Sequence, residues 1–218
     1  EHKAIANFLY QGYVPKEDTI YKNCYKLQPG QYAVLYKGSL QIFSYWQPEN
    51  EIDPTVLTDE KSAKKSLQEL LQSSIKYCMI SDVPLGVFLS GGIDSSLVTA
   101  IAQSVSTTSV KTFSIGFKEA KFNESQYASN VANHLKTDHH EFIVSEKDAL
   151  GLIDDILNVY DEPYADSSAI PTMLVSQMAR KHVTVALSGD GGDELFWGYG
   201  AYFWARRLQN PFLKGLRK

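Results

Sequence analysis

The sequence predicts an α/β protein built on a parallel sheet with helices on both faces, preceded by a short β-hairpin. Three observations predict it. From residue 58 onward, segments with helical apolar spacing alternate with short apolar runs that fit buried strands. Two of these runs lead directly into glycine-rich loops, which is where open α/β sheets bind ligands. Before residue 50, two alternating segments flank a Lys-Gly-Ser turn, which is typical of a hairpin.

The composition is that of an ordinary globular chain. It has 218 residues, of which 44% are hydrophobic and 21% charged, and a net charge of -4 with both signs interspersed. This argues against a nucleic-acid binder, which needs clustered Lys and Arg. Cys24 and Cys78 lack metal-ligand spacing, and no apolar run approaches the about 18 residues of a membrane span. We therefore expect a cytoplasmic protein with free thiols and, because residue 1 is Glu rather than Met, a natural start upstream.

The expected elements define two regions. Strands are expected at residues 31–36 and 40–46, and a lone hairpin cannot bury a core. We therefore interpret residues 1–50 as the tail of a first domain, 51–57 as a linker and 58–218 as the N-terminal part of a second domain. In the second region we expect helices at 61–79, 95–103, 124–135, 147–160 and 170–181, and strands at 83–89, 110–117, 140–144 and 183–187.

The first loop with chemical potential spells Leu-Ser-Gly-Gly-Ile-Asp-Ser-Ser over residues 89–96, between a strand and a helix. Two glycines let the backbone approach a ligand closely, and the N–H groups that open a helix favour an anion. Asp94 would repel a phosphate unless a cation bridged them, so Mg²⁺ is implied. No Lys follows the glycines, which excludes a Walker A loop. The alternative interpretation is a Gly-Gly turn with an Asp helix cap.

The second loop, residues 187–196, also follows an apolar strand. It carries three glycines and the acids Asp190, Asp193 and Glu194. Packed acids destabilise one another without a cation, and an Mg²⁺ site shared with Asp94 would resolve this. The two loops meet only if their strands are neighbours, which spacing alone leaves open. An acidic surface turn is the alternative.

The third loop, residues 160–171, joins two predicted helices and offers acids, hydroxyls and two prolines. These groups could contact a substrate. Equally, Ser168 could simply cap the next helix, with Pro171 in its first turn.

Five segments in this order resemble asparagine synthetases of the glutamine-hydrolysing type, within the ATP-pyrophosphatase superfamily. They are residues 90–96, 112–117, 122–125, 161–171 and 187–195. Residues 13–15, 26–30 and 45–46 resemble the end of that family's glutaminase domain, so the resemblance covers about residues 5–208. It implies an adenine nucleotide alpha hydrolase-like fold, preceded by a β-hairpin remnant of an N-terminal nucleophile-type glutaminase domain.

The resemblance also implies a reaction and its residues. ATP and Mg²⁺ would convert aspartate to asparagine through an aspartyl-adenylate and ammonia from glutamine. Asp190 and Asp94 would be catalytic, Asp94 and Asp193 would hold Mg²⁺, and loop 161–168 would meet the acceptor. Nucleotide and pyrophosphate contacts are implied for Leu89, Ser90, Gly91, Gly92, Asp94, Ser95, Ser96, Ile115, Gly116, Ser188 and Gly189. The partners would be small-molecule substrates rather than nucleic acid or membrane, and a homodimer is one assembly open to the full-length enzyme.

Three departures from the family pattern bear on activity. Residue 1 is Glu, where the family's glutaminase has a Cys nucleophile. Lys214 and Lys218 lie too close to the second glycine-rich loop to match the family's downstream catalytic Lys. Asn123 replaces the usual Asp. We therefore expect the chain by itself to hydrolyse no glutamine and to adenylate poorly.

Other functions stay open at this stage. A relative of the same family could amidate another carboxylate, such as a uronic acid in polysaccharide synthesis. A catalytically silent nucleotide-binding module is a second alternative, although it would have no need to keep packed acids. A tRNA-modifying relative is disfavoured, because the chain shows neither a basic stretch nor a cysteine pair.

Overall fold

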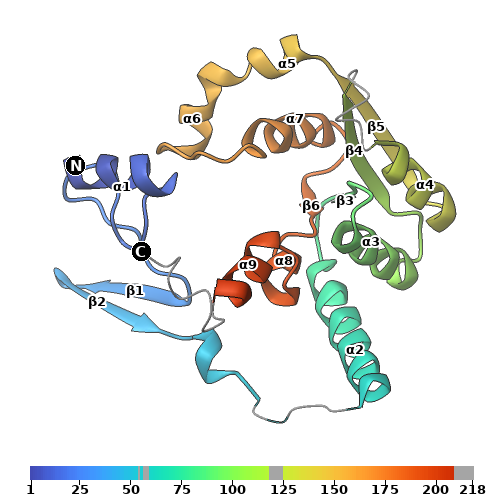
Figure 1. Cartoon of the computed structure of the whole chain (residues 1–218), viewed down its shortest axis with the longest axis horizontal. Helices are drawn as coiled ribbons and strands as arrows, with labels where there is room; N and C mark the ends of the chain where they lie inside the picture. The colour runs from blue at the N-terminus through green and yellow to red at the C-terminus, as the bar shows by residue number, and fades with distance from the viewer. Residues whose placement is uncertain (54, 56–58, 118–124, 209–218) are drawn as a thin grey trace. The chain divides into compact units, whose positions relative to one another are not determined.

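The computed structural model describes residues 1–53, 55, 59–117 and 125–208. The chain divides into two compact units, each built from two separate stretches of sequence (Figure 1). Unit 1 combines Glu1–Lys64 with Ala149–Pro171, and unit 2 combines Lys65–Asp148 with Thr172–Lys218.

Unit 2 is organised around a parallel sheet of four strands in the order β5-β4-β3-β6. Every neighbouring pair runs parallel, so the predicted parallel sheet is confirmed. The predicted strand positions agree with those observed to within about two residues. The strands are β3 (Leu85–Phe88), β4 (Lys111–Phe117), β5 (Asp138–Val144) and β6 (Val185–Leu187).

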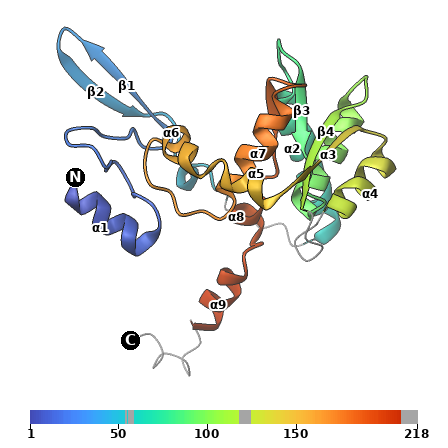
Figure 2. The same cartoon turned by 90° about the horizontal axis from the view of Figure 1, so that it is seen from above.

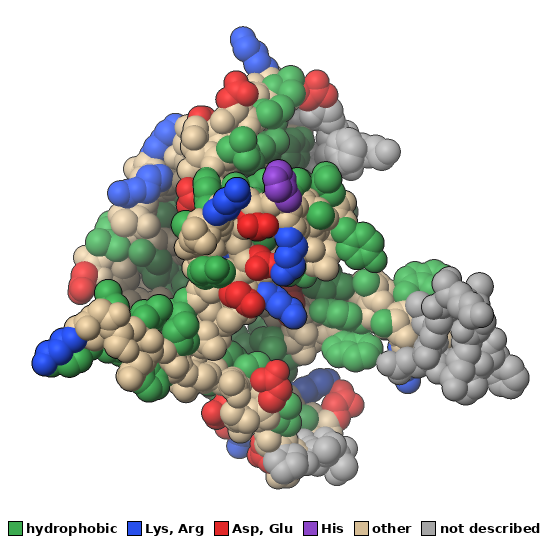
Figure 3. All heavy atoms as spheres, turned by 90° about the vertical axis from the view of Figure 1, so that its left-hand side faces the viewer, with side chains coloured by type: hydrophobic (Ala, Val, Ile, Leu, Met, Phe, Trp, Pro, Cys, Tyr) green, Lys and Arg blue, Asp and Glu red, His purple; other side chains and the backbone are tan. Residues whose placement is uncertain are grey.

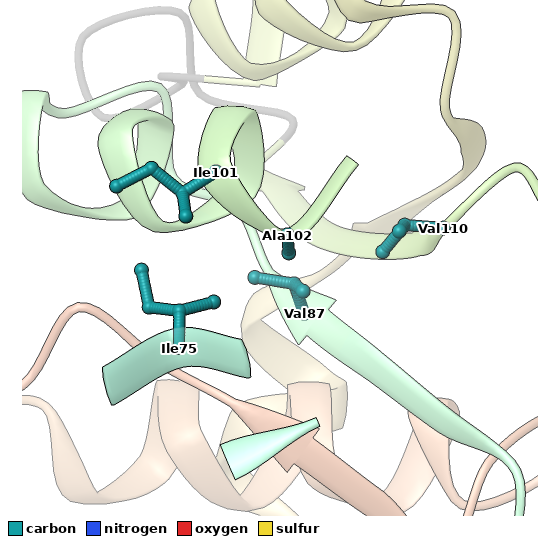
Figure 4. Packing of buried hydrophobic residues seen from close by; sticks show 5 residues of the cluster. All are labelled: Ile75, Val87, Ile101, Ala102 and Val110. Carbon is teal, nitrogen blue, oxygen red and sulfur yellow. The ribbon is translucent and has the colours of Figure 1, made fainter. Parts of the chain in front are cut away.

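Helices cover one face of this sheet at Val87. This side chain is fully buried and packs with Ile75 of α2 (Glu60–Cys78) and with Ile101 and Ala102 of α3 (Ile93–Val105), as Figure 4 shows. Leu89 follows Val87 by two residues and therefore points to the same side, where it packs on Ala128 and Ala132 of α4 (Ser125–Leu135).

The opposite face is covered by α7 (Ala169–Ala179). Phe113 of β4 is fully buried and forms a cluster with Ala179 and Val183, against which Phe88 and Phe142 pack. Because Val87 and Phe88 are consecutive in one strand, their side chains lie on opposite faces. Helices on both faces of the sheet are therefore confirmed.

Unit 1 contains the predicted hairpin, formed by β1 (Gln31–Tyr36) and β2 (Ser39–Ser44). Lys37 and Gly38 connect the strands with positive φ angles of 48° and 79°, which is the type of two-residue turn that hairpins favour. Both faces of this ribbon carry exposed apolar residues: Tyr32 stacks on Phe43 on one face, and Leu35 lies opposite Leu40 on the other.

The structure differs from the prediction at residues 147–160. The single expected helix is divided into α5 (Glu146–Leu150), a 3-10 turn over Ile153–Asp155, and α6 (Ile156–Tyr160). The break falls at Gly151, a residue type that is costly in a helix interior. There Leu152 donates its N–H to Ala149, three residues back, so the backbone tightens instead of continuing the helix.

Among the described residues, three α-helices lie outside the expected elements: α1 (His2–Gln11), α8 (Gly192–Phe196) and α9 (Gly200–Leu208), which are labelled in Figure 2. In α2, the apolar side chains of Leu67 and Leu70 are exposed and Ile75 is buried. Cys24 and Cys78 are free and exposed. Within the described part of the chain, no helix has the length and apolar character needed to cross a bilayer.

Replacing Phe113 with Ala should lower the free energy of unfolding by about 3–5 kcal/mol, because the ring is fully buried between β5 and α7 side chains. The measurement is urea unfolding followed by far-UV circular dichroism. Phe203→Ala is the matched control, since that ring is exposed, and it should cost less than about 0.5 kcal/mol. Equal costs for the two variants would contradict this packing.

Candidate functional site at the carboxyl edge of the sheet

The two glycine-rich loops meet because β3 and β6 are hydrogen-bonded neighbours. Val87 is in register with Leu187, so the loops that follow leave the sheet at the same edge. A Cβ placed on Gly189 would lie 2.8 Å from the Ser95 nitrogen, and one on Gly192 would lie 2.9 Å from the Asp94 carboxylate oxygens. The second loop therefore packs directly on the start of α3, which fulfils the condition that the sequence left open.

The first loop is held in shape by its own hydroxyl groups. The Ser90 and Ser95 hydroxyls lie 2.9 Å apart, the Ser90 N–H donates to Ser95 Oγ, and the Gly92 N–H donates to Ser90 Oγ. Gly91 has a φ of +83°, and a Cβ there would lie 2.6 Å from the Ala128 nitrogen of α4. Both its backbone conformation and its neighbours thus require glycine at this position.

Ser96 differs from the other two serines of this loop. Its Oγ is buried and has no hydrogen-bond partner among the described residues. It sits in the first turn of α3, where by helix geometry the leading N–H groups have no intrahelical acceptor. A buried hydroxyl beside the positive end of a helix can donate to an anionic oxygen. The Ser90 and Ser95 hydroxyls, by contrast, already take part in the loop's internal hydrogen bonds.

The acids of the second loop occupy different surroundings. Asp190 is exposed, whereas the Asp193 carboxylate packs against Gly198, whose missing side chain makes room for it. Glu194 accepts a hydrogen bond of 2.7 Å from the Tyr199 hydroxyl, and this bond raises the pKa of Tyr199 to about 12 and lowers the pKa of Glu194. Tyr199 therefore stays protonated at any physiological pH.

The carboxylates of the two loops are of the kind that bind a magnesium ion together with the phosphates of a nucleotide. Among the described residues, no three of His, Cys, Asp and Glu converge as a metal cage. Mg²⁺ typically takes one or two carboxylates and completes its shell with water and substrate phosphates. Two residues offer such carboxylates. Asp94 of the first loop packs against Gly192 of the second, and Asp193 is the second residue of α8.

The predicted adenosine residues lie on the neighbouring strands. Ile115 and Gly116 belong to the second half of β4, and Gly116 is buried. Leu89 is buried at the end of β3, and its N–H donates to Phe113. Ser188 and Gly189 directly follow β6. Unit 2 therefore places every predicted nucleotide residue on or just after β4, β3 or β6.

Loop 161–168 belongs to unit 1. Asp166 organises it by accepting hydrogen bonds from the Ser168 N–H, the Ser168 hydroxyl and the Tyr164 hydroxyl, at 2.7 to 2.8 Å. These donors, the Ser168 N–H foremost, hold the pKa of the Asp166 carboxyl below its ordinary value. The Ser168 hydroxyl, expected as a possible cap of α7, therefore donates to Asp166.

Some predicted positions lie outside the described residues. These are Phe122, Asn123 and Glu124, together with Lys214 and Lys218. Sequence analysis also missed a pairing in unit 1: the Lys26 ammonium lies 2.7 Å from the Glu162 carboxylate. Both residues stand in segments that resemble the family, but sequence spacing gives no signal that they touch.

Comparison with known proteins identifies the family of the chain. The family model for asparagine synthase matches residues 66–216. The chain belongs to the asparagine synthase family. It is 40% identical to a glutamine-hydrolysing asparagine synthetase of Methanocaldococcus jannaschii over 99% of the chain, and 35% identical to asparagine synthetase 1 of Bacillus subtilis over 93%. It spans 41% and 32% of the lengths of these relatives.

Solved structures with a related fold are more distant. A glutamine-dependent NAD⁺ synthetase from Acinetobacter baumannii, in complex with ADP, shares 21% identity with a TM-score of 0.45, covering 75% of this chain and 32% of that one. An NH₃-dependent NAD synthetase from Campylobacter jejuni shares 17% identity with a TM-score of 0.39, covering 66% and 62%.

Substituting Gly91 with Ala should destabilise unit 2 more than substituting Gly191, although both glycines have positive φ. An Ala costs about 1–2 kcal/mol in this backbone conformation. At Gly91 the new Cβ also collides with Ala128 and Tyr127, whereas a Cβ on Gly191 has nothing within 4 Å. We expect an additional 1–3 kcal/mol or so for Gly91→Ala, measured by urea unfolding. A smaller cost at Gly91 than at Gly191 would refute the close packing of this loop on α4.

Acid should weaken loop 161–168 through Asp166. Its pKa is lowered in the folded state, so its stabilising effect is present above about pH 4, the ordinary carboxyl range, and is lost as pH falls through the lowered value. Asp166→Asn should therefore be less stable than wild type at pH 7, and this deficit should shrink as the pH falls below about 4, the ordinary carboxyl range. The measurement is amide hydrogen exchange of residues 164–169 in wild type and in Asp166→Asn, at pH 7 and at a pH below 4. A deficit that is independent of pH would contradict it.

Proposed function

We propose that this chain carries the ATP-binding part of a carbon–nitrogen ligase that converts aspartate to asparagine. The side-chain carboxylate of aspartate is activated with ATP, and ammonia derived from glutamine then replaces the activating group. The proposal combines membership of the asparagine synthase family with the chemistry available at the carboxyl edge of the sheet.

One observation carries the proposal more than any other: the packing of the loop after β6 on the start of α3. This packing sets the Asp94 carboxylate against Gly192, beside the helix end whose N–H groups favour anions. A negative side chain at an anion site needs a cation to balance it, and nucleotide phosphates bound with a divalent cation meet that need. The buried, unpartnered Ser96 hydroxyl adds a donor that no described protein group uses.

In the proposed mechanism, the backbone N–H groups of residues 93–95, which open α3, bind the β- and γ-phosphates, and the Ser96 hydroxyl donates to one of their oxygens. Pyrophosphate is the leaving group, so these donors stabilise the negative charge that grows on it in the transition state. Because the donors are fixed by the loop's own hydrogen bonds, little reorganisation accompanies the reaction.

Asp94 and Asp193 are the residues that would hold Mg²⁺. The ion would neutralise phosphate charge and so allow an anionic carboxylate to approach the α-phosphorus. The second loop comes close enough only because residues 189 and 192 have no side chains.

An oxygen of the aspartate side-chain carboxylate forms a bond to the α-phosphorus, and the bond from that phosphorus to the bridging oxygen breaks, releasing pyrophosphate. The nitrogen of ammonia then attacks the acyl carbon, the C–O bond to AMP breaks, and the nitrogen loses a proton. Asp190, exposed in the second loop, is the carboxylate that we propose to face the reacting centre and accept this proton.

The test is ATP–pyrophosphate exchange by the full-length protein with a panel of carboxylic acids. We expect exchange that depends on aspartate, and a loss of about 100-fold or more in Asp94→Asn, because metal-assisted stabilisation of this charge is worth several kcal/mol. Asp82→Asn is the matched control. It removes the same charge from an exposed residue just before β3, at the other end of the strand, and should leave exchange within about twofold, as expected of an exposed surface site.

Other outcomes would change the assignment. Exchange with a sugar acid but not with aspartate would move the chain to a relative that amidates polysaccharide precursors. Binding of Mg²⁺-ATP without exchange for any acid would indicate a silent nucleotide-binding module. Equal exchange in Asp94→Asn and wild type would remove the proposed role of the two loops.

A further inference from the structure

Two segments of unit 1 that are far apart in sequence are joined by several polar contacts. We define the N-terminal arm as residues 12–28. Within it, the Gly12 carbonyl accepts the Ala165 N–H at 2.8 Å, and the Tyr21 hydroxyl donates to the Asp161 carbonyl at 3.2 Å. The Lys26 ammonium lies 2.7 Å from the Glu162 carboxylate. Three separate points of the arm therefore hold three points of loop 161–168.

The arm is itself braced, so it can act as a fixed support. The Thr19 hydroxyl bonds the carbonyls of Tyr21 and Cys24, and the Lys26 N–H donates to Glu17. Lys3 of α1 pairs with Asp18 at 3.1 Å. Acidic and basic side chains lie interleaved on the side of the molecule seen in Figure 3.

Lys26 occupies the centre of this junction. Its ammonium group donates to the Val14 carbonyl as well as to Glu162, both at 2.7 Å, and Val14 is buried. The Lys26 and Glu162 side chains are 36% and 24% exposed, so water screens the pair only in part.

Charge gives the pair a second effect. Asp161, Glu162 and Asp166 bring three carboxylates to one short loop. Among the residues that the structure describes, only Lys26 lies within ion-pair distance of one of these carboxylates, that of Glu162. An anionic ligand that approached this loop would be repelled, and neutralising Glu162 reduces that repulsion.

We propose that Lys26 and Glu162 are positioning residues for the acceptor: their ion pair keeps loop 161–168 in the conformation, and at the charge, that a dicarboxylic acid needs in order to bind. The inference rests on the proposed function, because it takes this loop to be the one that meets the acceptor. Lys26 acts through Glu162 and the loop backbone and does not touch the substrate. The arm belongs to the stretch that resembles the end of a glutaminase domain, so the pair links that stretch to acceptor binding.

The test measures ATP–pyrophosphate exchange of the full-length protein at varied aspartate and varied ATP. Lys26→Met should raise the KM for aspartate about fivefold, in line with one partly exposed ion pair, and should leave the KM for ATP and the rate at saturating aspartate within about twofold. Lys22→Met, at an exposed lysine of the same arm, is the control and should change neither KM. Lys26→Arg, which keeps the charge, should stay within about twofold of wild type.

A charge reversal separates the ion pair from a general loss of packing. Lys26→Glu alone should raise the KM for aspartate, because it breaks the ion pair and adds a negative charge, and combining it with Glu162→Lys should bring the KM back toward wild type. Amide hydrogen exchange gives a readout that is independent of activity: the Ala165 N–H should exchange faster in Lys26→Met than in Lys22→Met.

The other outcomes distinguish a failure of the inference from a failure of the proposed function. An unchanged KM for aspartate in Lys26→Met, or an equal rise in the KM for ATP, would overturn the inference and leave the proposed function intact. So would a double variant that is no better than Lys26→Glu alone. Wild-type protein without exchange for any acid would overturn the proposed function and the inference with it.

Discussion

The parallel pairing of β3 with β6 is the constraint on which the candidate site depends. Residues 85–87 and 185–187 are far apart in sequence, yet their hydrogen bonds bring both glycine-rich loops to one edge of the sheet. With another strand between them, Asp94 would lie in one loop and Gly192 in a distant one. The absence of side chains at Gly189 and Gly192 then allows backbone-to-backbone approach. Sheet topology and glycine placement are therefore two parts of one requirement.

Much of this arrangement could be predicted from sequence. The strands of unit 2 are short apolar runs, and fully buried parallel strands need such runs. The type and order of the elements therefore followed from these runs and from the glycine, proline and polar residues between them. The position of the glycine loops at strand ends followed in the same way. The neighbour relation of β3 and β6 could not be predicted, because segment spacing does not determine strand order. It depends on which apolar faces pack together, such as Phe88 and Phe113 against α7.

The failures of the sequence analysis have local causes. The helix expected over 147–160 breaks at Gly151. We expected one helix because the apolar spacing favours it, but a glycine in a helix interior is costly. Ser168 was expected as a possible cap of α7, because serine is a common capping residue. The helix starts at Ala169, and the longer reach of the Asp166 carboxylate lets it accept two donors from Ser168. In the same way, the sequence does not distinguish Ser95 from Ser96. The Ser95 hydroxyl accepts a hydrogen bond within the loop, whereas the Ser96 hydroxyl is buried and has no partner among the described residues.

The composition of unit 1 from two stretches has a consequence for synthesis on the ribosome. Glu1–Lys64 leaves the ribosome before its partner stretch Ala149–Pro171, because residues 65–148 lie between the two. At about 5–20 residues per second, the arm waits on the order of ten seconds before loop 161–168 is available to it. During that interval the Gly12 carbonyl, the Tyr21 hydroxyl and the Lys26 ammonium lack the partners that loop 161–168 gives them. The N-terminal arm therefore reaches its folded contacts only after translation has passed residue 171.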